Sequence, residues 1–352
     1  MQDDILFVPG RLSLIGGISD LVSSYLSQNK DLVPGAAIAV TLDKGIYSHA
    51  SENDKFIYKY DDIYYECERQ EETLKEQINS NNFLSYICGT LLYMKRKYGE
   101  QIGGLELEII EMDLPIKKGL SSSAAICITI AKHMNRLYNL NLSNDDIVNI
   151  AYNGEHLAGS KCGMLDQNSI MNPGLSHLTF FEERTEVIPL DIGADIDILI
   201  VDLNSKKNTR KIMDFYNNAM SFPQELDNKK VYDFFKNDNH KLVKYAMNSI
   251  KRGDLRGLGK SFNKFQECID VFGNYCDELK APVLHSILCD EYIKENTHGG
   301  KGTGSGGDGS AMLVCKDSNS SSSLNKYIKE KYNMDTTEVH IKKKVKCLEC
   351  IK

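Results

Sequence analysis

The chain has 352 residues, of which 41% are hydrophobic and 26% charged, and its formal net charge is -7. This length exceeds what one hydrophobic core usually serves, so we expect two domains. The negative charge argues against nucleic acid as the main partner, because phosphate-backbone binding needs a basic face.

The N-terminus and the hydropathy pattern bear on location. The opening MQDDILFVPG is acidic where a signal peptide would be basic. No run of 18 consecutive apolar residues occurs in the sequence. We therefore expect a cytoplasmic protein without a membrane partner.

The first segment predicts a strand followed by a glycine turn. Residues 5–8 form a short apolar run that we expect to end at Pro9-Gly10-Arg11. Gly16-Gly17 precedes Ser19 and Asp20, and such a turn can place backbone and a carboxylate against a ligand. An N-cap role for Asp20, at the start of a helix over residues 21–26, is equally compatible with the sequence.

Strands and one core helix are predicted next. Residues 36–50 contain strand-like runs, and the polar, tyrosine-rich residues 54–75 are predicted to be an exposed connection. Apolar residues then recur at helical spacing from Phe83 to Tyr98, and Gly99 supplies the stop. Alternating leucine, isoleucine and glutamate over residues 105–109 predict a strand.

The segment PIKKGLSSSAA, residues 115–125, joins that strand to a helical pattern that starts at Ala124. The first N–H groups of a helix have no intrahelical acceptor and carry the positive end of its dipole, so a phosphate is a natural ligand. Gly119 permits close backbone approach, and Ser121 to Ser123 can add hydrogen bonds or a Mg2+ ligand. Helix capping by the serines is an equally good interpretation.

A capping-box pattern from Ser143 predicts a helix through Tyr152. We interpret His156, which follows on an amphipathic segment, as structural. A turn at residues 172–174 leads to a predicted strand over 176–181.

The chain changes character near residue 185, which places a domain boundary between residues 185 and 195. A strand over 196–203 is predicted to follow it. Residues 210–294 are helix-compatible, with breaks at Gly253, Gly257 and Gly259. Residues 318–323 are predicted to be a surface loop before a helix over 324–332 and a closing strand.

Residues 298–309 form a glycine-rich loop, which precedes a strand predicted over 311–315. Gly302, Gly304 and Gly307 satisfy G-x-G-x-x-G, yet a dinucleotide-binding fingerprint needs a strand before the loop and a helix after it. The predicted order is helix, loop, strand, and the Walker lysine-serine pair is missing. We therefore expect a ligand-facing loop of another kind.

Three separated segments resemble the signatures of the GHMP kinase superfamily. They are residues 8–16, similar to the PGR-x-x-x-x-G opening, residues 115–125, and residues 300–311. The resemblance implies an α+β fold with two domains. Residues 1–188 would form an N-terminal domain with a mixed β-sheet and helices, and residues 189–352 a C-terminal α/β sandwich, with the active site in the cleft between them.

Within the superfamily, Cys162 to Gln167 resembles the CG-x-x-DQ segment of galactokinases and arabinokinases, which implies that Asp166 is the catalytic base with Arg11 close by. The segment Gly16 to Asp20 is closer to the GG-x-[AST]-D of plant arabinokinase, fucokinase and heptose kinase than to galactokinase. Galactokinases carry a magnesium glutamate twelve positions before the base, where this chain has Gly154. Glu155 is one residue nearer, or about 100° of helix rotation away.

The resemblance implies an ATP-dependent kinase that phosphorylates a monosaccharide at the anomeric hydroxyl, as a monomer or homodimer. The implied cofactors are ATP and Mg2+, and the metal ligands would be Ser122 and Glu155. A mevalonate-type kinase and a non-catalytic sugar or ATP sensor on the same fold are the alternatives. The implied ATP-binding residues are Lys118, Gly119, Leu120, Ser121, Ser122, Ser123 and Ala124. The implied substrate-binding residues are Gly17, Asp20, Gly163, Gly304, Gly306 and Gly307.

Overall fold

A computed structural model describes residues 5–80, 82–114 and 119–343. The chain divides into two compact units, unit 1 with Met1–Leu12 and Val40–Gly174, and unit 2 with Ser13–Ala39 and Leu175–Lys352. This division differs from a single boundary after residue 188, because residues 13–39 are grouped with the C-terminal part of the chain. The predicted boundary itself stays a prediction.

Unit 1 contains a mixed β-sheet. Its strand order is β4-β3-β5-β2, and β1 also pairs with β2. β3 runs parallel to β5, whereas the β3-β4 and β2-β5 pairs are antiparallel. The strands are β1 (Leu6–Ile15), β2 (Gly35–Asn53), β3 (Phe56–Tyr60), β4 (Ile63–Cys67) and β5 (Gly104–Met112), of which β1 and β2 each have residues in both units.

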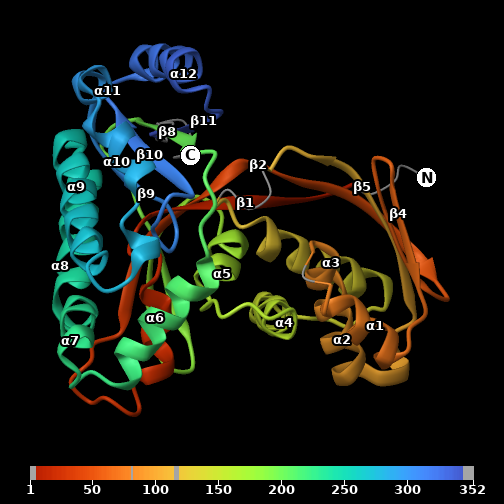
Figure 1. The fold of residues 1–352 in the computed structure, drawn as a ribbon. Helices are drawn as coiled ribbons and strands as arrows, with labels where there is room; N and C mark the ends of the chain where they lie inside the picture. The colour runs from red at the N-terminus through yellow and green to blue at the C-terminus, as the bar shows by residue number, and fades with distance from the viewer. Residues whose placement is uncertain (1–4, 81, 115–118, 344–352) are drawn as a thin grey trace, which may run out of the picture. The chain divides into compact units, whose positions relative to one another are not determined.

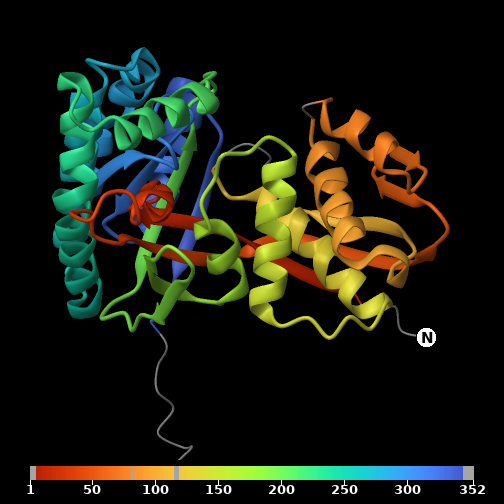
Figure 2. The same cartoon turned by 90° about the horizontal axis from the view of Figure 1, so that it is seen from below.

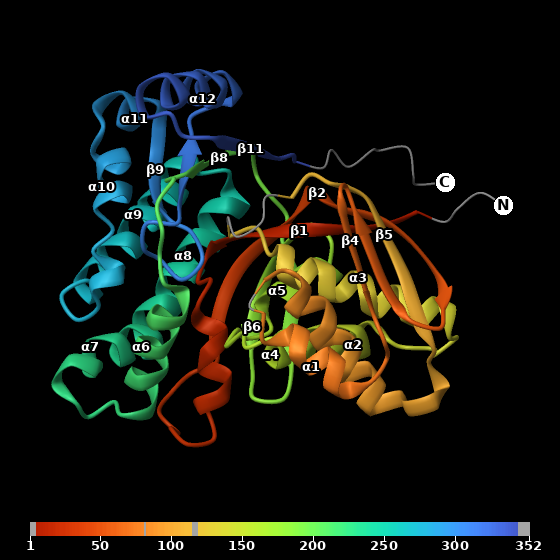
Figure 3. The same ribbon diagram turned by 45° about the vertical axis from the view of Figure 1, so that its right-hand side comes forward.

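Helices cover one face of this sheet (Figures 1 and 3), and Figure 2 shows them from below in orange to yellow-green. The α2 and α4 helices touch at Gly89 and Gly154: a Cβ atom on Gly154 would lie only 2.8 Å from the Thr90 Cα atom. Gly154 therefore faces α2. The helices are α1 (Glu71–Ile78), α2 (Leu84–Tyr98), α3 (Ser122–Leu137), α4 (Asn144–Leu157) and α5 (Leu165–Met171).

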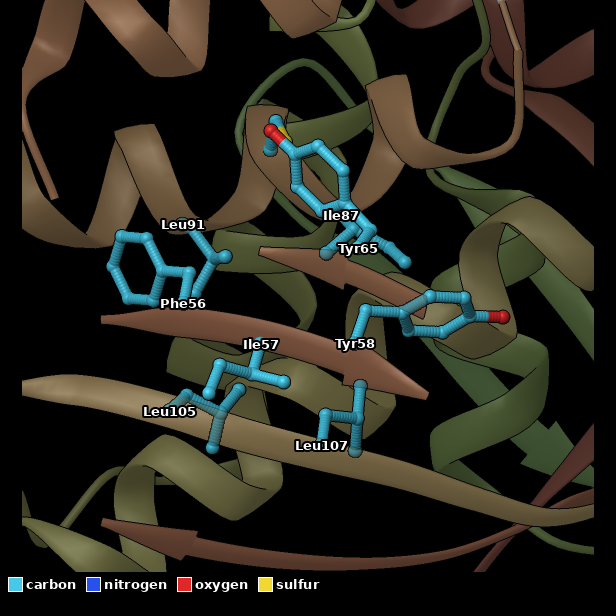
Figure 4. Close-up of a pocket in the computed structure, with 9 residues that line it drawn as sticks. Phe56, Ile57, Tyr58, Tyr65, Ile87, Leu91, Leu105 and Leu107 are labelled. Atoms are coloured by element: carbon cyan, nitrogen blue, oxygen red, sulfur yellow. The ribbon is translucent and has the colours of Figure 1, made fainter. Parts of the chain in front are cut away.

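A small pocket lies between α2 and the sheet of unit 1 (Figure 4). Its volume of about 10 Å³ is that of roughly one water molecule, so it cannot hold a nucleotide or a sugar. Figure 4 shows that the labelled side chains come from the helix above the strands and from the strands themselves. The lining residues are Phe56, Ile57, Tyr58, Tyr65, Ile87, Cys88, Leu91, Leu105 and Leu107.

Unit 2 contains a four-stranded antiparallel sheet in the order β11-β8-β10-β9. Two further strands, β6 and β7, pair with each other. The strands are β6 (Leu175–Phe180), β7 (Thr185–Pro189), β8 (Ile196–Asp202), β9 (Thr297–Gly302), β10 (Ser310–Cys315) and β11 (Thr336–Ile341).

Helices complete unit 2 (Figure 1). Alternate residues of β8 and β10, such as Leu199, Val201 and Leu313, pack in one buried cluster with Leu284 of α10 and Leu324 of α12. The helices are a 3-10 helix (Ser19–Tyr25), α6 (Thr209–Ser221), α7 (Leu226–Asp233), α8 (Asn239–Arg252), α9 (Leu255–Phe272), α10 (Pro282–Cys289), α11 (Glu291–Asn296) and α12 (Ser318–Tyr332). No helix of the described ranges is long and apolar enough to cross a membrane.

Two predictions about the N-terminal half are wrong. β1 does not end at Pro9-Gly10-Arg11 but continues to Ile15. Residues 54–75 are not an exposed connection, because they contain β3, β4 and the start of α1. Tyr58 is buried in β3, and the packing of this strand in the sheet overrides the polar composition of the segment.

Three predictions about the C-terminal half also fail. Gly257 and Gly259 lie inside α9 instead of breaking it. The helix packs closely on β9, and a Cβ atom on Gly259 would lie 2.7 Å from the His298 Cβ atom, so this contact needs a glycine in the helix. Residues 318–323 belong to α12, whose N-cap Asp317 accepts a hydrogen bond from the Ser320 N–H. The glycine-rich segment begins as β9, so the loop connects two antiparallel strands.

Candidate active site

The centre of the site in unit 1 is the carboxylate of Asp166, which lies in the first turn of α5. The Arg11 Nε atom donates to Oδ1 at 2.7 Å, and Arg11 Nη2 donates to the same oxygen. The Ser121 hydroxyl donates to Oδ2 at 2.6 Å. Residues from three distant parts of the sequence therefore meet at one carboxylate.

The Arg11 guanidinium also fixes the backbone before α3. Its Nη1 atom donates to the Gly119 carbonyl at 2.8 Å, and the Arg11 N–H donates to the Leu120 carbonyl at 3.2 Å. Gly119 has φ +79°, a conformation that glycine adopts without steric cost. Arg11 thus sets the position of both Asp166 and the loop that leads into α3.

The lone pairs of Asp166 are occupied unequally. A carboxylate offers about four acceptor positions, two on each oxygen. Oδ1 accepts both Arg11 bonds, whereas within the described part of the chain Oδ2 accepts only the bond from Ser121. The Asp166 side chain is 20% exposed, against 8% for Arg11. Oδ2 is therefore the oxygen that can accept a further proton donor.

The N-terminus of α3 has the properties expected of an anion site. Ser121 precedes the helix in a left-handed conformation, with φ 62° and ψ 40°, and its side chain does not cap the helix. The first intrahelical bond runs from the Ala125 N–H to the Ser121 carbonyl. The N–H groups of Ser122, Ser123 and Ala124 thus lie ahead of the helical hydrogen-bond pattern and form the positive end of the dipole. The capping interpretation is wrong for Ser121, because its hydroxyl binds Asp166 instead. Lys118 lies outside the described residues.

Glu155 is buried beside this centre, only 2% exposed. It accepts hydrogen bonds from the Gln167 Nε2 atom and from Ser123. Burial, and next the negative charge of Asp166, raise the pKa of Glu155 to about 8. Gly154, one position earlier on α4, faces α2, whereas Glu155 contacts Gln167 and Ser123.

Among the described residues, the donor groups near Glu155 include few of the ligands that a hard cation prefers. Within residues 5–80, 82–114 and 119–343, no group of three or more His, Cys, Asp or Glu side chains could hold a metal ion. Mg2+ commonly takes one or two protein oxygens and completes its shell with water and phosphate. A buried carboxylate with a raised pKa would gain from such a cation, so the Glu155 carboxylate is a donor of the kind that fits Mg2+.

Sequence reasoning missed the role of Gln167. This side chain is fully buried, holds Glu155 by its amide nitrogen, and leaves its Oε1 atom without a partner among the described residues. Its place directly after Asp166 is the signal that could have indicated it. His156 pairs its Nε2 atom with the Cys162 carbonyl at 2.8 Å, in agreement with the predicted structural role.

Unit 2 brings together two of the predicted substrate residues. A Cβ atom on Gly17 would lie 4.0 Å from the Gly304 carbonyl oxygen, so the residue that follows the first signature segment adjoins the third. Asp20 is buried in the first turn of the 3-10 helix, whose N-cap is Ile18. The N-cap interpretation of Asp20 is therefore wrong.

Two of the remaining predicted substrate glycines have a positive backbone φ angle. Gly306 and Gly307 have φ of +88° and +75°, so the loop needs glycine at both positions. Gly163 belongs to unit 1 and lies partly buried between α4 and α5.

Residues 85–173 match the family model of the GHMP kinases N terminal domain. These residues form a GHMP kinase N-terminal domain, and the chain has the fold of the GHMP kinases. Its curated relatives include the galactokinase of Thermosipho africanus, 23% identical over 92% of each chain, and that of Pyrococcus furiosus, 25% identical over 88% of each.

Solved structures of the same fold include two different activities. Lactococcus lactis galactokinase complexed with galactose is similar with a TM-score of 0.73 and 18% identity, over 97% of this chain and 94% of that one. The mevalonate kinase of Methanococcus jannaschii gives 0.72 and 19%, over 97% and 98%. The fold is therefore common to sugar and mevalonate kinases.

Proposed function

We propose that this chain is an ATP-dependent kinase that transfers a phosphoryl group to a monosaccharide, at the anomeric hydroxyl. The observation that carries the proposal is the Asp166 carboxylate, held by Arg11 and Ser121 next to the N-terminus of α3. The curated galactokinases of similar length support a sugar as the acceptor.

In this proposal Asp166 is the base. Its Oδ2 atom accepts the proton of the sugar hydroxyl, while Arg11 orients the carboxylate and offsets negative charge on the transferred group. A positioned base typically contributes about 10²–10⁴ to the rate. Phosphoryl transfer otherwise depends on positioning and charge neutralisation, which the rigid Arg11 contacts would supply.

The phosphates of ATP would bind the N-terminal end of α3. Gly119 and Leu120 lead into that end, and the N–H groups of Ser121 to Ala124 surround it. Mg2+, when bound to Ser122 and Glu155, would neutralise phosphate charge. Gln167 and Ser123 hold the Glu155 side chain in place for this role.

The candidate acceptors are galactose, L-arabinose, L-fucose and a heptose derivative, and galactose itself is in doubt because Gly17 and Ile18 stand where galactokinases carry a Glu-His pair. The residues proposed to bind it are Gly17, Asp20, Gly163, Gly304, Gly306 and Gly307. A cytoplasmic location and a monomer or homodimer remain predictions.

A mevalonate-type kinase is the second candidate, favoured by the nearly equal TM-scores of the mevalonate kinase and galactokinase structures. An ATP-consumption assay over galactose, L-arabinose, L-fucose, heptose 7-phosphate and mevalonate separates the candidates. We expect turnover with one sugar and a product phosphorylated at the anomeric carbon. Turnover with mevalonate alone would contradict the sugar assignment, and no turnover with any acceptor, despite ATP binding, would favour a sensor.

A further inference from the structure

Lys207 lies in unit 2, in the loop between β8 and α6, and follows the backbone of the glycine-rich loop. Its Nζ atom donates to the Gly306 carbonyl at 2.8 Å. A Cβ atom on Gly309 would lie 2.8 Å from the Lys207 Cε atom, and one on Gly307 would lie 3.6 Å from Cδ. The lysine therefore runs along the second half of this loop, residues 303–309.

The Lys207 ammonium has no counter-charge among the described residues. It makes one hydrogen bond and no ion pair, although an ammonium has three donors. Lys207 is half-buried, and burial lowers the pKa of Lys207 to about 8. A desolvated cation of this kind is stabilised by an anion.

The two nearby carboxylates are engaged elsewhere. Asp308 accepts from the N–H groups of Val283 and Leu284 at 3.2 and 2.8 Å, at the start of α10. Glu278 accepts from the Asn208 N–H at 2.9 Å and lies 3.9 Å from the Lys211 Nζ atom. Neither neutralises Lys207.

Ser305 provides a second, independent observation in the same loop. The residue is 8% exposed, and its Oγ atom has no hydrogen-bond partner in the described part of the chain. A buried hydroxyl without a partner is costly unless a ligand satisfies it. The Lys207 ammonium, which contacts the Gly306 carbonyl, and the Ser305 hydroxyl, which has no partner among the described residues, therefore both lie at one glycine-rich loop.

We propose that Lys207 and Ser305 bind a phosphoryl group at residues 303–309. The identity of the anion as phosphate rests on the proposed kinase function. It has two sources, the terminal phosphate of the nucleotide or a phosphate already carried by the sugar acceptor. Lys207 is not among the residues assigned above to ATP or to the sugar.

Isothermal titration of the full chain tests the proposal with AMP-PNP, ADP and heptose 7-phosphate as probes. The variant is Lys207→Met, and the matched control is Lys206→Met, which removes the exposed charge one position earlier. Loss of a charge-assisted hydrogen bond should weaken binding of the phosphate-bearing probe about 10- to 100-fold, while the control stays within about twofold.

The probes distinguish the sources. Weaker AMP-PNP binding with unchanged ADP binding identifies the terminal phosphate of the nucleotide, and weaker heptose 7-phosphate binding alone identifies the acceptor. Unchanged binding of all three probes by Lys207→Met would overturn the proposal. Ser305→Ala should lower affinity for the same probe.

Folding is controlled separately. Lys207→Arg keeps the charge and should restore most of the affinity. If Lys207→Met does not fold, the measurement is NMR of the wild-type chain labelled with 13C-lysine. Saturating pyrophosphate should raise the pKa of Lys207. An unchanged pKa of Lys207 would refute the site. The acceptor panel on the wild type is independent, so a chain that binds pyrophosphate at Lys207 but phosphorylates no acceptor would refute the kinase and not this site.

Discussion

The substitution Glu155→Gln should change how stability depends on pH. Glu155 is buried, and its pKa is raised from 4.5 to about 8 in the folded chain. Between these values the folded state keeps a proton that the unfolded state has lost. The wild-type free energy of unfolding should therefore fall as the pH rises from 4.5 to 8, and Glu155→Gln, which cannot ionise, should lack this contribution.

The size of the effect follows from the shift. A change from 4.5 to about 8 corresponds to a loss of up to about 5 kcal/mol. Urea unfolding followed by circular dichroism at pH 5 to 9 measures it as the difference between the two chains, in which the other titrating groups cancel. Parallel curves of unfolding free energy against pH would refute the buried, protonated Glu155.

The same pair of chains tests the magnesium role. A divalent cation favours the ionised carboxylate, so MgCl2 with AMP-PNP should stabilise the wild type at pH 8 more than it stabilises Glu155→Gln. Equal stabilisation of the two chains would remove Glu155 from the metal site.

The other predictions concern the carboxylate, the helix contact and the sugar. Ser121→Ala and Ser121→Gly should both lower kcat at least about tenfold, because each removes the charge-assisted bond to Asp166. Since glycine tolerates φ 62°, the Gly variant should be about 1 kcal/mol more stable than the Ala variant. A Gly variant with normal kcat would refute the orienting role of Ser121. Gly154→Ala should lower the free energy of unfolding by at least about 2 kcal/mol, because the new Cβ atom would lie 2.8 Å from Thr90 Cα. An unchanged melting temperature would refute the close contact between α2 and α4. Asp20→Ala should raise the sugar KM, and an unchanged KM would end that assignment.

Much of the fold could be predicted because the relevant signals are local. The periodic apolar residues before Gly99 predicted α2, and Ser143 with Asp146 forms the capping box that starts α4. Alternation over residues 105–109 predicted β5. Each of these elements is specified by side chains within one or two turns of it.

Two of the failures concern segments specified by distant contacts. Gly259 lies within α9, where the helix packs closely on β9. The sequence of α9 alone cannot predict this contact. Tyr58 is buried in a strand whose partner in β5 lies almost fifty residues later in the chain. Composition alone described both segments wrongly.

The candidate site shows the same division. Motif resemblance indicated Arg11 and Asp166, and the structure brings them into contact. Motif resemblance could not indicate that the Ser121 hydroxyl donates to Asp166, because this contact depends on a left-handed backbone at the start of α3. The contacts of Glu155 with Gln167 and Ser123 come from two other helices, and Lys207 follows a loop almost a hundred residues away.

In the proposed reaction, the Asp166 carboxylate removes a proton from a sugar hydroxyl. The most direct measurement is the turnover of Asp166→Asn with the acceptor found in the sugar panel, together with its AMP-PNP affinity by titration calorimetry. We predict a turnover lower by at least about 10² with nearly unchanged nucleotide affinity. Near-normal turnover would contradict the account.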